Sequence, residues 1–501
     1  MATSDSTGQA TLTTSSTIST EKSRQVKASD QSERFHRFVS VERLGAYSDA
    51  VFSIIVTFMI IPLSTSVEDF QIYSDVKDNL IAEWHLFFIY IVCYFFVFSL
   101  WEHHVRVYEV VEHVGDVVIV LNVIQLLAAS MLPFLGALLG DYHEDPLATV
   151  VFSLDFVAIA VLQLLSVLFA YRRKKMMRDN INKREAVIEL CSSSGILLCL
   201  STVSAAIAFL NTTAAWVILG LALFADTFSI IVVAIYQRFH PHEKYHTLSR
   251  YLAHRLITTR SNPDRTKNLT DGVFAIVATL IILDLTNAAA NPSDTGPGSI
   301  KAELQDDKET FFSYFATFST VGMIWYVHYT VFHPIQKLSR ITSLCNKWVL
   351  LFVGVLPMGF KLISKYSTDT WDADENTAVQ FNCAIIFGAS ICQLLTWLSG
   401  HWKREKHLHV GYGRIHVYWC LALLLVYPTI SLLLFLIAFS PSTLDANAVQ
   451  AIQISVPALF CVIKMCFEIY VHKAGHAYHT EDIDESDPSD GNDEASVDTN
   501  L

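Results

Sequence analysis

Two aspartates stand where an apolar segment of the chain begins, and each follows an arginine by six residues. Asp49 follows Arg43, and Asp271 follows Arg265. An ionisable group inside an apolar segment is costly to bury, so it is normally paired or turned toward a polar path. The pattern therefore indicates two buried polar sites, which either hold neighbouring segments together or line a route for an ion.

Further polar side chains recur in the same order after each aspartate. A Trp-x-x-His motif follows both aspartates, and an asparagine then precedes a proline by eleven residues in both places. Such side chains can join three successive apolar segments by hydrogen bonds, and this architectural role is favoured over ion permeation. The set comprises Arg43, Ser48, Asp49, Trp101, His104 and Asn122, and then Arg265, Thr270, Asp271, Trp325, His328 and Asn346.

A narrow stripe of small, hydroxyl and aliphatic side chains follows each aspartate at helical spacing. Hydroxyls can replace part of an ion's hydration shell, and an aliphatic ring can close a pore by dewetting. The same residue types also favour close packing of two helices, so both interpretations remain open. The stripes are Ala50, Ser53, Ile54, Thr57 and Ile61, and Gly272, Ala275, Ile276, Thr279 and Leu283.

The sequence offers little support for enzymatic chemistry. It contains no P-loop and no GxSxG, and its polar loops are too short for a catalytic domain. The nine cysteines lie in or beside apolar runs, without a CxxC or a Cys/His zinc spacing, and are expected to be buried as small hydrophobic residues. We therefore expect no enzyme activity, no cofactor and no metal site.

The elements that must position these residues are long apolar segments. Hydrophobic residues make up 52% of the 501 residues and charged residues only 17%, and the mean hydropathy is +0.39. Twelve runs are long enough to cross a bilayer, which predicts an all-α polytopic membrane protein with twelve transmembrane helices. The runs are 46–64, 84–106, 116–139, 147–171, 187–210, 214–236, 269–286, 310–332, 346–363, 378–400, 415–438 and 448–471.

The distribution of charge predicts the orientation in the lipid bilayer. With the amino terminus inside, 29 lysines and arginines fall on the inner side and five on the opposite side, so both termini are expected to be cytosolic. The net charge of −13 owes much to nine acidic residues between Glu481 and Asp498, which are typical of a disordered tail. Nothing indicates that the chain binds nucleic acid.

The two halves of the chain are related by an internal duplication. Residues 49–64 and 271–286 are identical at seven of sixteen positions, and the later motifs keep their order. Because each unit has six spans, an even number, the two six-helix repeats are expected to be parallel. The predicted organisation is a disordered cytosolic arm (1–33), a first repeat (34–237), a cytosolic linker (238–264), a second repeat (265–473) and an acidic disordered cytosolic tail (474–501).

The motif around the first aspartate resembles the signature of a known family. Arg43 and Tyr47-Ser48-Asp49 are similar to the Arg-x-x-x-Phe-Ser-Asp signature of the transmembrane protein 175 family, whose members are potassium and proton channels of endosomes and lysosomes. The resemblance covers about residues 34–472 and includes the Trp/His and Asn positions. The sequence departs from the signature at Tyr47, where Phe is usual, and at Leu269-Thr270-Asp271, which replaces Phe-Ser-Asp.

This resemblance implies a fold, a pore and an assembly. In the family the first helix of each repeat lines the pore and an isoleucine forms the constriction, which corresponds here to Ile54 and Ile276. Ser53, Thr57 and Thr279 correspond to the neighbouring polar layer. Four such helices surround the pore, so a two-repeat chain is expected to act as a homodimer in endosomal and lysosomal membranes and to conduct potassium ions and protons.

A secondary transporter is the main alternative, because parallel six-plus-six repeats are also a transporter layout. Transporters commonly have broken spans around a binding site at the bilayer midplane. Pro133 and Pro357 could kink the third span of each repeat. The first spans are expected to lack a Gly or Pro interruption, which favours a channel.

Overall fold

The computed structural model describes residues 40–68, 70, 75–173, 176–179, 182–239, 263–290, 308–366, 373–401, 414–439 and 446–484. Within these ranges the chain is mostly helical, with turns and a few bridge residues between the helices, among them the pair Val111 and Met177. The predicted linker lies almost entirely outside the described residues, as does most of each predicted disordered end. The last helix runs on to Asp484, past residue 474, where the acidic tail was predicted to begin.

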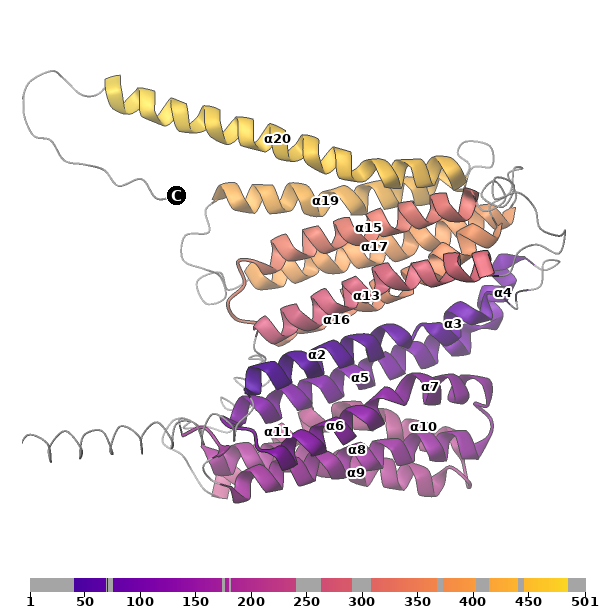
Figure 1. Ribbon diagram of the computed structural model, residues 1–501, viewed down its shortest axis with the longest axis vertical. Helices are drawn as coiled ribbons and strands as arrows, with labels where there is room; N and C mark the ends of the chain where they lie inside the picture. Colours follow the sequence, from indigo (N-terminus) through magenta and orange to yellow (C-terminus); the bar gives the residue numbers. More distant parts are fainter. Residues whose placement is uncertain are drawn as a thin grey trace, which may run out of the picture.

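The helices follow one another in two series, one for each predicted repeat (Figure 1). The first series is α2 (Val41–Phe58), α3 (Ile61–Ser66), α4 (Val76–Ala82), α5 (Trp84–Val110), α6 (Asp116–Ser130), α7 (Leu132–Asp141), α8 (Pro146–Arg172), α9 (Lys183–Ile207), α10 (Thr212–Leu221), the short 3-10 helix η2 (Ala222–Phe224) and α11 (Ala225–Phe239). The second series is α13 (Pro263–Ala290), α15 (Lys308–Phe332), α16 (Arg340–Tyr366), α17 (Ala373–His401), α19 (Arg414–Ile437) and α20 (Ala446–Asp484).

Eleven helical segments of the described chain are long and apolar enough to cross a membrane. They correspond to eleven of the twelve predicted spans. The remaining prediction, 310–332, coincides with α15, a helix of 25 residues that is richer in hydroxyl and polar aromatic side chains. The prediction of an all-α polytopic membrane protein is therefore confirmed, whereas the count of twelve spans stays a prediction.

Two helices of the first repeat are broken where their counterparts in the second repeat are continuous. Pro62 lies in the first turn of α3, and Pro133 lies in the first turn of α7. Proline cannot donate a backbone hydrogen bond, and its ring clashes with the carbonyl four residues earlier, so the preceding helices end at Phe58 and Ser130. The expectation that the first spans are uninterrupted is wrong for the first repeat.

The second repeat has continuous helices at the positions equivalent to Pro62 and Pro133. α13 continues without a break to Ala290, and Asp284 stands at the position of Pro62. α16 is a single helix that contains Pro357 in its interior. The predicted kink of the third span is therefore a full break at Pro133, while the helix around Pro357 remains continuous.

The repeats meet through helices α2 and α5 on one side and α13 and α16 on the other. Figure 1 shows α2 and α13 near the middle of the chain, with α8 and α9 at one edge and α19 and α20 at the other. The Tyr90 hydroxyl donates to the carbonyl of Leu351 (3.0 Å), and the Tyr94 hydroxyl donates to that of Lys347 (2.7 Å). The Lys347 ammonium also lies 2.8 Å from the Glu102 carboxylate, so polar contacts as well as apolar packing join the repeats.

Candidate functional site

The carboxylate of Asp49 is buried at the contact between the two repeats. Its Oδ1 accepts hydrogen bonds from Trp101 Nε1 (2.8 Å) and Arg265 Nη2 (2.7 Å), and its Oδ2 accepts one from Arg265 Nε (2.5 Å). The side chain of Asp49 is 1% exposed. The fork of the arginine side chain thus binds both carboxylate oxygens, which is the geometry that best compensates a buried charge.

A second set of hydrogen bonds joins α2, α5 and α6. His104 Nε2 lies 2.7 Å from Asn122 Oδ1, and Asn122 Nδ2 donates to the Ser48 hydroxyl at 3.2 Å. The Ser48 hydroxyl donates in turn to the carbonyl of Leu44 (2.9 Å). All three side chains are buried, so the asparagine ties the other two helices together where water does not compete.

The second repeat contains the same arrangement. Trp325 Nε1 donates to Asp271 Oδ1 at 2.8 Å. His328 Nε2 lies 2.8 Å from Asn346 Oδ1, and Asn346 Nδ2 donates to the Thr270 hydroxyl at 3.1 Å. The structure therefore brings together, in each repeat, the Trp, His, Asn, hydroxyl and Asp residues singled out in the sequence.

The two arginines differ in their surroundings. Arg265 binds the aspartate of the other repeat, although the sequence spacing suggested a partner within its own repeat. Arg43 is exposed, and so is Asp271, whereas Asp49 is covered by Arg265. Arg43 is thus not paired with Asp49 in the structure. No sequence signal distinguished the two repeats, because both arginines precede their aspartates by the same distance.

Helices α2 and α13 approach each other closely at a serine and a glycine. The Ser53 hydroxyl donates to the carbonyls of Asp49 (2.8 Å) and Leu269 (2.9 Å). A Cβ atom at Gly272 would lie only 2.5 Å from Ser53 Oγ, so the glycine permits this approach. Ser53 therefore faces α13 directly.

Ser53 and Thr57 do not lie on the exposed side of α2. Both side chains are 0% exposed, and the Thr57 hydroxyl donates to the carbonyls of Ser53 (3.0 Å) and Ile54 (2.9 Å). Thr279 is exposed, and its hydroxyl donates to carbonyls of its own helix. Ser53, Thr57 and Thr279 were expected to form a polar layer of the pore. Of these three, only Thr279 lies on an exposed face of its helix.

Each of the two helices has an exposed stripe at helical spacing. On α2 it is mainly aliphatic and aromatic, and Ile54 at its centre is 43% exposed. On α13 it is more polar, and Ile276 beside it is half-buried. The first stripe consists of Tyr47, Ala50, Ile54 and Phe58 on α2 and is continued by Ile61 at the start of α3, and the second consists of Asp271, Ala275, Thr279 and Leu283 on α13.

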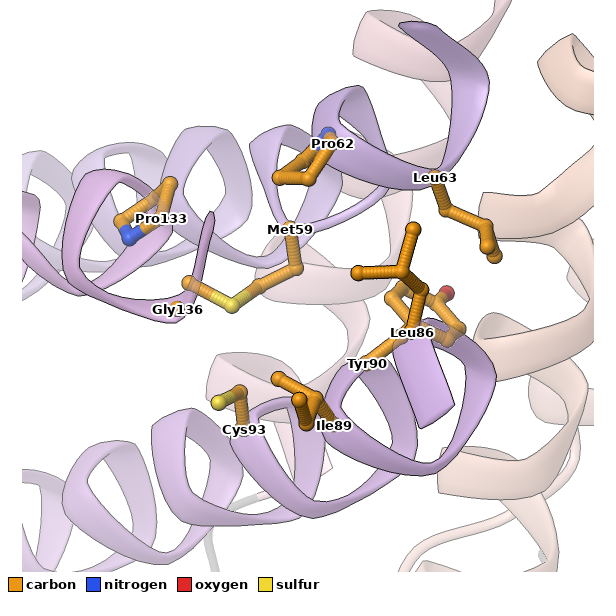
Figure 2. A pocket seen from close by; sticks show the side chains of 9 residues that line it. All are labelled: Met59, Pro62, Leu63, Leu86, Ile89, Tyr90, Cys93, Pro133 and Gly136. Atoms are coloured by element: carbon orange, nitrogen blue, oxygen red, sulfur yellow. The ribbon is translucent and has the colours of Figure 1, made fainter. Parts of the chain in front are cut away.

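A small apolar pocket lies behind the break between α2 and α3. Figure 2 shows Met59 and Pro62 at the break, with Cys93 of α5 and Pro133 and Gly136 of α7 around the same space. Its volume is about 10 Å³, enough for roughly one water-sized sphere, and its lining is mainly apolar. Both broken helices of the first repeat therefore border one packing defect. Among the described residues, no three His, Cys, Asp or Glu side chains are grouped to hold a metal ion.

Comparison with known proteins identifies relatives of this arrangement. The family model described as "Endosomal/lysosomal potassium channel TMEM175" matches residues 43–133 and 265–357, which are the first three spans of each repeat. The endosomal/lysosomal proton channel TMEM175 of Danio rerio is 28% identical over 448 residues, which cover 86% of this chain and 84% of that protein. The human protein of the same name is 28% identical over 451 residues, or 85% of this chain and 86% of its own length.

A bacterial relative is shorter. A potassium channel of Streptomyces collinus is 28% identical over 144 residues, which cover 29% of this chain and 66% of that protein. The family model thus matches twice, on the segments that carry the duplicated Arg, Asp, Trp, His and Asn residues, and the vertebrate proteins match over both repeats. This chain is therefore similar to the TMEM175 family in both of its repeats.

Proposed function

We propose that this protein is a cation channel of endosomal and lysosomal membranes that is permeable to potassium ions and protons. The proposal is supported by the names of its relatives, which are endosomal/lysosomal proton channels in vertebrates and potassium channels in bacteria. Channel activity also fits a chain whose duplicated polar residues are organised around two adjacent helices.

One observation carries the assignment of the pore. α2 and α13 lie side by side, and each leaves a stripe of side chains uncovered although the helices lie at the centre of the chain. Ile54 lies on this exposed side, and Ile276 occupies the equivalent position of the second repeat. We assign these two isoleucines to a hydrophobic constriction that closes the pore by dewetting. Thr279 supplies the polar layer, whereas Ser53 and Thr57 secure the helices.

A pore needs more than two helices, and the surfaces of α2 and α13 predict how a second copy completes it. Across the contact inside the chain, α13 presents Arg265, Leu269 and Gly272 to Asp49 and Ser53. The equivalent residues for a second contact of the same geometry all lie on exposed or partly exposed surface. They are Arg43, Tyr47 and Ala50 of one copy and Asp271 and Ala275 of the other.

The helices beside this surface are also uncovered. α5 packs on α16 within the chain, and their counterparts α15 and α6 expose large apolar side chains instead. A homodimer would bury both faces by repeating the contact between the repeats. The exposed side chains are Phe315, Phe318, Trp325 and Tyr329 on α15, and Val117, Val120, Val123, Ile124 and Leu127 on α6.

The remaining assignments concern architecture and orientation. The buried hydrogen bonds of Asp49, Trp101, His104 and Asn122, and their counterparts in the second repeat, lock the first three spans of each repeat so that the pore helices stay aligned. Both termini lie in the cytosol, and residues 34–237 and 265–473 form the parallel repeats. The bias of lysine and arginine toward one side supports this orientation.

Patch-clamp recording from enlarged endolysosomes that express the chain tests the function. Potassium, sodium and luminal pH are stepped in turn for wild type and for the Ile54→Ala/Ile276→Ala variant. We expect potassium and proton currents in wild type and a changed conductance or selectivity in the variant, because a smaller side chain widens an aliphatic ring. Ile231→Ala/Ile235→Ala is the matched control, since both isoleucines are exposed on α11, away from the proposed pore.

The break between α2 and α3 favours a second candidate, a secondary transporter, because discontinuous helices are typical of transporter binding sites. The same recordings separate the two. A protein that reaches the membrane and passes no current, but moves a solute at a saturating rate, is a transporter. If the wild type passes a current and the isoleucine variant passes the same current, the protein is a channel whose constriction lies at other residues.

A further inference from the structure

The connection between α8 and α9 concentrates positive charge. Residues 171–184 contain seven lysines and arginines and one acidic residue. The connection between α5 and α6 on the same side of the first repeat, residues 111–115, contains no lysine or arginine. A general excess of positive charge on cytosolic loops does not favour one loop over the other, so it does not account for this concentration. The basic residues are Arg172, Arg173, Lys174, Lys175, Arg178, Lys183 and Arg184, of which 174 and 175 lie outside the described residues.

This connection is held against the end of α5. A backbone bridge pairs Met177 with Val111, and the Arg178 amide donates to the carbonyl of Val110 (3.1 Å). Met176 and Met177 are 6% and 4% exposed and belong to an apolar cluster that also contains Val110 and Val111. The two methionines therefore anchor the connection, and the basic residues on either side of them have a defined position.

Three arginines of the connection are available to a ligand. The side chains of Arg172, Arg178 and Arg184 are exposed, and within the described part of the chain their guanidinium groups form no hydrogen bond or ion pair. Asp179, the acidic residue of the connection, is paired with Lys183 (2.7 Å). Basic residues outnumber acidic ones even when the acidic residues of the adjoining segments are counted, which are Glu109, Glu112, Asp116 and Glu185.

The ends of the two helices distinguish these arginines. Arg172 lies in the last turn of α8, where the helix dipole favours a positive charge. Arg184 lies in the first turn of α9, where the dipole favours a negative charge. The helix itself therefore does not favour an arginine at position 184, whereas a bound anion would interact favourably with both the arginine and the dipole.

The exposed face of α8 leads directly to Arg172. α8 has 27 residues and is about 40 Å long, more than the roughly 30 Å of the hydrocarbon layer, so its ends reach the lipid headgroups. Figure 1 shows α8 and α9 at the edge of the chain, away from α2 and α13. A stripe of exposed aliphatic side chains follows α8 at helical spacing up to the arginine, and it consists of Leu147, Val151, Leu154, Ala158, Val161, Leu165 and Leu168.

We propose that Arg172, Arg178 and Arg184 bind the headgroup of an anionic phospholipid that carries phosphate monoesters, as phosphorylated phosphatidylinositols do. The forked guanidinium group matches the oxygens of a phosphate, and basic clusters next to the cytosolic end of a transmembrane helix attract such lipids. One acyl chain lies along the aliphatic stripe of α8. Binding attaches the pair of helices α8 and α9 to the leaflet that the predicted orientation makes cytosolic.

The site is independent of the proposed channel, because lipid binding is measured without a current. The full chain is placed in nanodiscs of phosphatidylcholine that contain a photoreactive phosphatidylinositol bisphosphate. After irradiation, mass spectrometry of the peptides locates the label. We expect label on residues 161–184, where the headgroup and the nearest part of the acyl chain lie.

Variants test the role of the arginines. In Arg172→Ala/Arg178→Ala/Arg184→Ala the label on this segment should fall at least about tenfold, because each basic residue near the membrane surface contributes to the attraction. All three side chains are exposed, so the variant should unfold at the same temperature as wild type. Lys77→Ala is the matched control, since Lys77 is exposed on α4 and lies on the opposite side by the predicted orientation, and its label should equal that of wild type.

Competition identifies the ligand. Unlabelled phosphatidylinositol bisphosphate should displace the label at a concentration at least about tenfold lower than phosphatidylserine, because the carboxylate and phosphodiester of serine lipids offer no phosphate monoester to the arginines. Soluble inositol trisphosphate should compete more weakly than the lipid, since it lacks the acyl chain. Label that is absent from 161–184, or that the triple variant leaves unchanged, would overturn the proposal. Equal competition by phosphatidylserine would overturn the recognition of phosphate monoesters, and equal competition by the soluble compound would overturn the assignment to a lipid.

Discussion

At the scale of single residues, the central feature is a carboxylate that one repeat supplies and the other neutralises. Asp49 is buried among apolar side chains, where an unpaired charge would be very costly. Arg265 binds both of its oxygens, and Trp101 supplies a further donor, so both oxygens accept hydrogen bonds. The pair therefore ties α2 of the first repeat to α13 of the second.

Removing the arginine should reveal this dependence. Arg265→Met is expected to destabilise the protein by about 3–5 kcal/mol, because it leaves the Asp49 charge buried without its cation. The measurement is the midpoint of thermal unfolding of the purified protein in detergent. In the Asp49→Asn/Arg265→Met variant no buried charge remains, so most of the loss should be recovered. An Arg265→Met variant as stable as wild type would show that the ion pair does not hold the repeats together.

At the scale of helices, small residues set how closely the spans approach. Gly388 of α17 lies against the ring of Phe352 on α16, and an added Cβ would come within 2.7 Å of that ring. Gly195 of α9 has no neighbouring atom within 4 Å of the equivalent position. The two glycines thus share a helical setting and differ in their packing.

This difference gives a matched prediction. Gly388→Ala is expected to lower stability by about 1–3 kcal/mol, because the ring and α16 must shift to admit the methyl group. Gly195→Ala should leave stability unchanged or raise it by up to about 1 kcal/mol, since alanine favours the helix. The midpoints of thermal unfolding of the two variants, measured side by side, test this prediction. Equal shifts of the two midpoints from that of wild type would contradict the packing argument.

The approximate positions of the spans were predictable from the sequence because apolar runs and bilayer thickness specify them together, whereas helices such as α13, α16 and α20 extend beyond the predicted runs. The duplicated Trp, His and Asn residues could also be assigned to one hydrogen-bonded set, since only their order along the chain was needed. The break at Pro62 and the burial of Ser53 were missed for a different reason. Both depend on which side of α2 faces α13, and a stripe of small and hydroxyl residues is compatible with either a pore or a helix contact.

At the scale of the whole molecule, the chain contains one contact between its repeats and, in the proposed homodimer, supplies the exposed halves of a second. The two are related but not identical, because Lys267 stands where Gly45 makes room for the Arg265 side chain, and Ala275 stands where Ser53 donates its hydrogen bond. A homodimer built from them has alternating strong and weaker contacts around its pore. Two-fold symmetry, with four helices of two kinds, is then the expected symmetry of the conduction path.

The weaker contact can be tested through its ion pair. In the proposed homodimer Arg43 of each copy meets Asp271 of the other, since both are exposed in the single chain. Arg43→Glu or Asp271→Arg alone places like charges opposite each other and is expected to weaken dimerisation by at least tenfold, while the Arg43→Glu/Asp271→Arg variant restores it. Subunit counting by light scattering of the purified protein measures the effect, with Glu42→Lys as a control for a charge change next to Arg43. Single variants that remain dimeric, or a double variant that stays dissociated, would place the interface elsewhere on the chain.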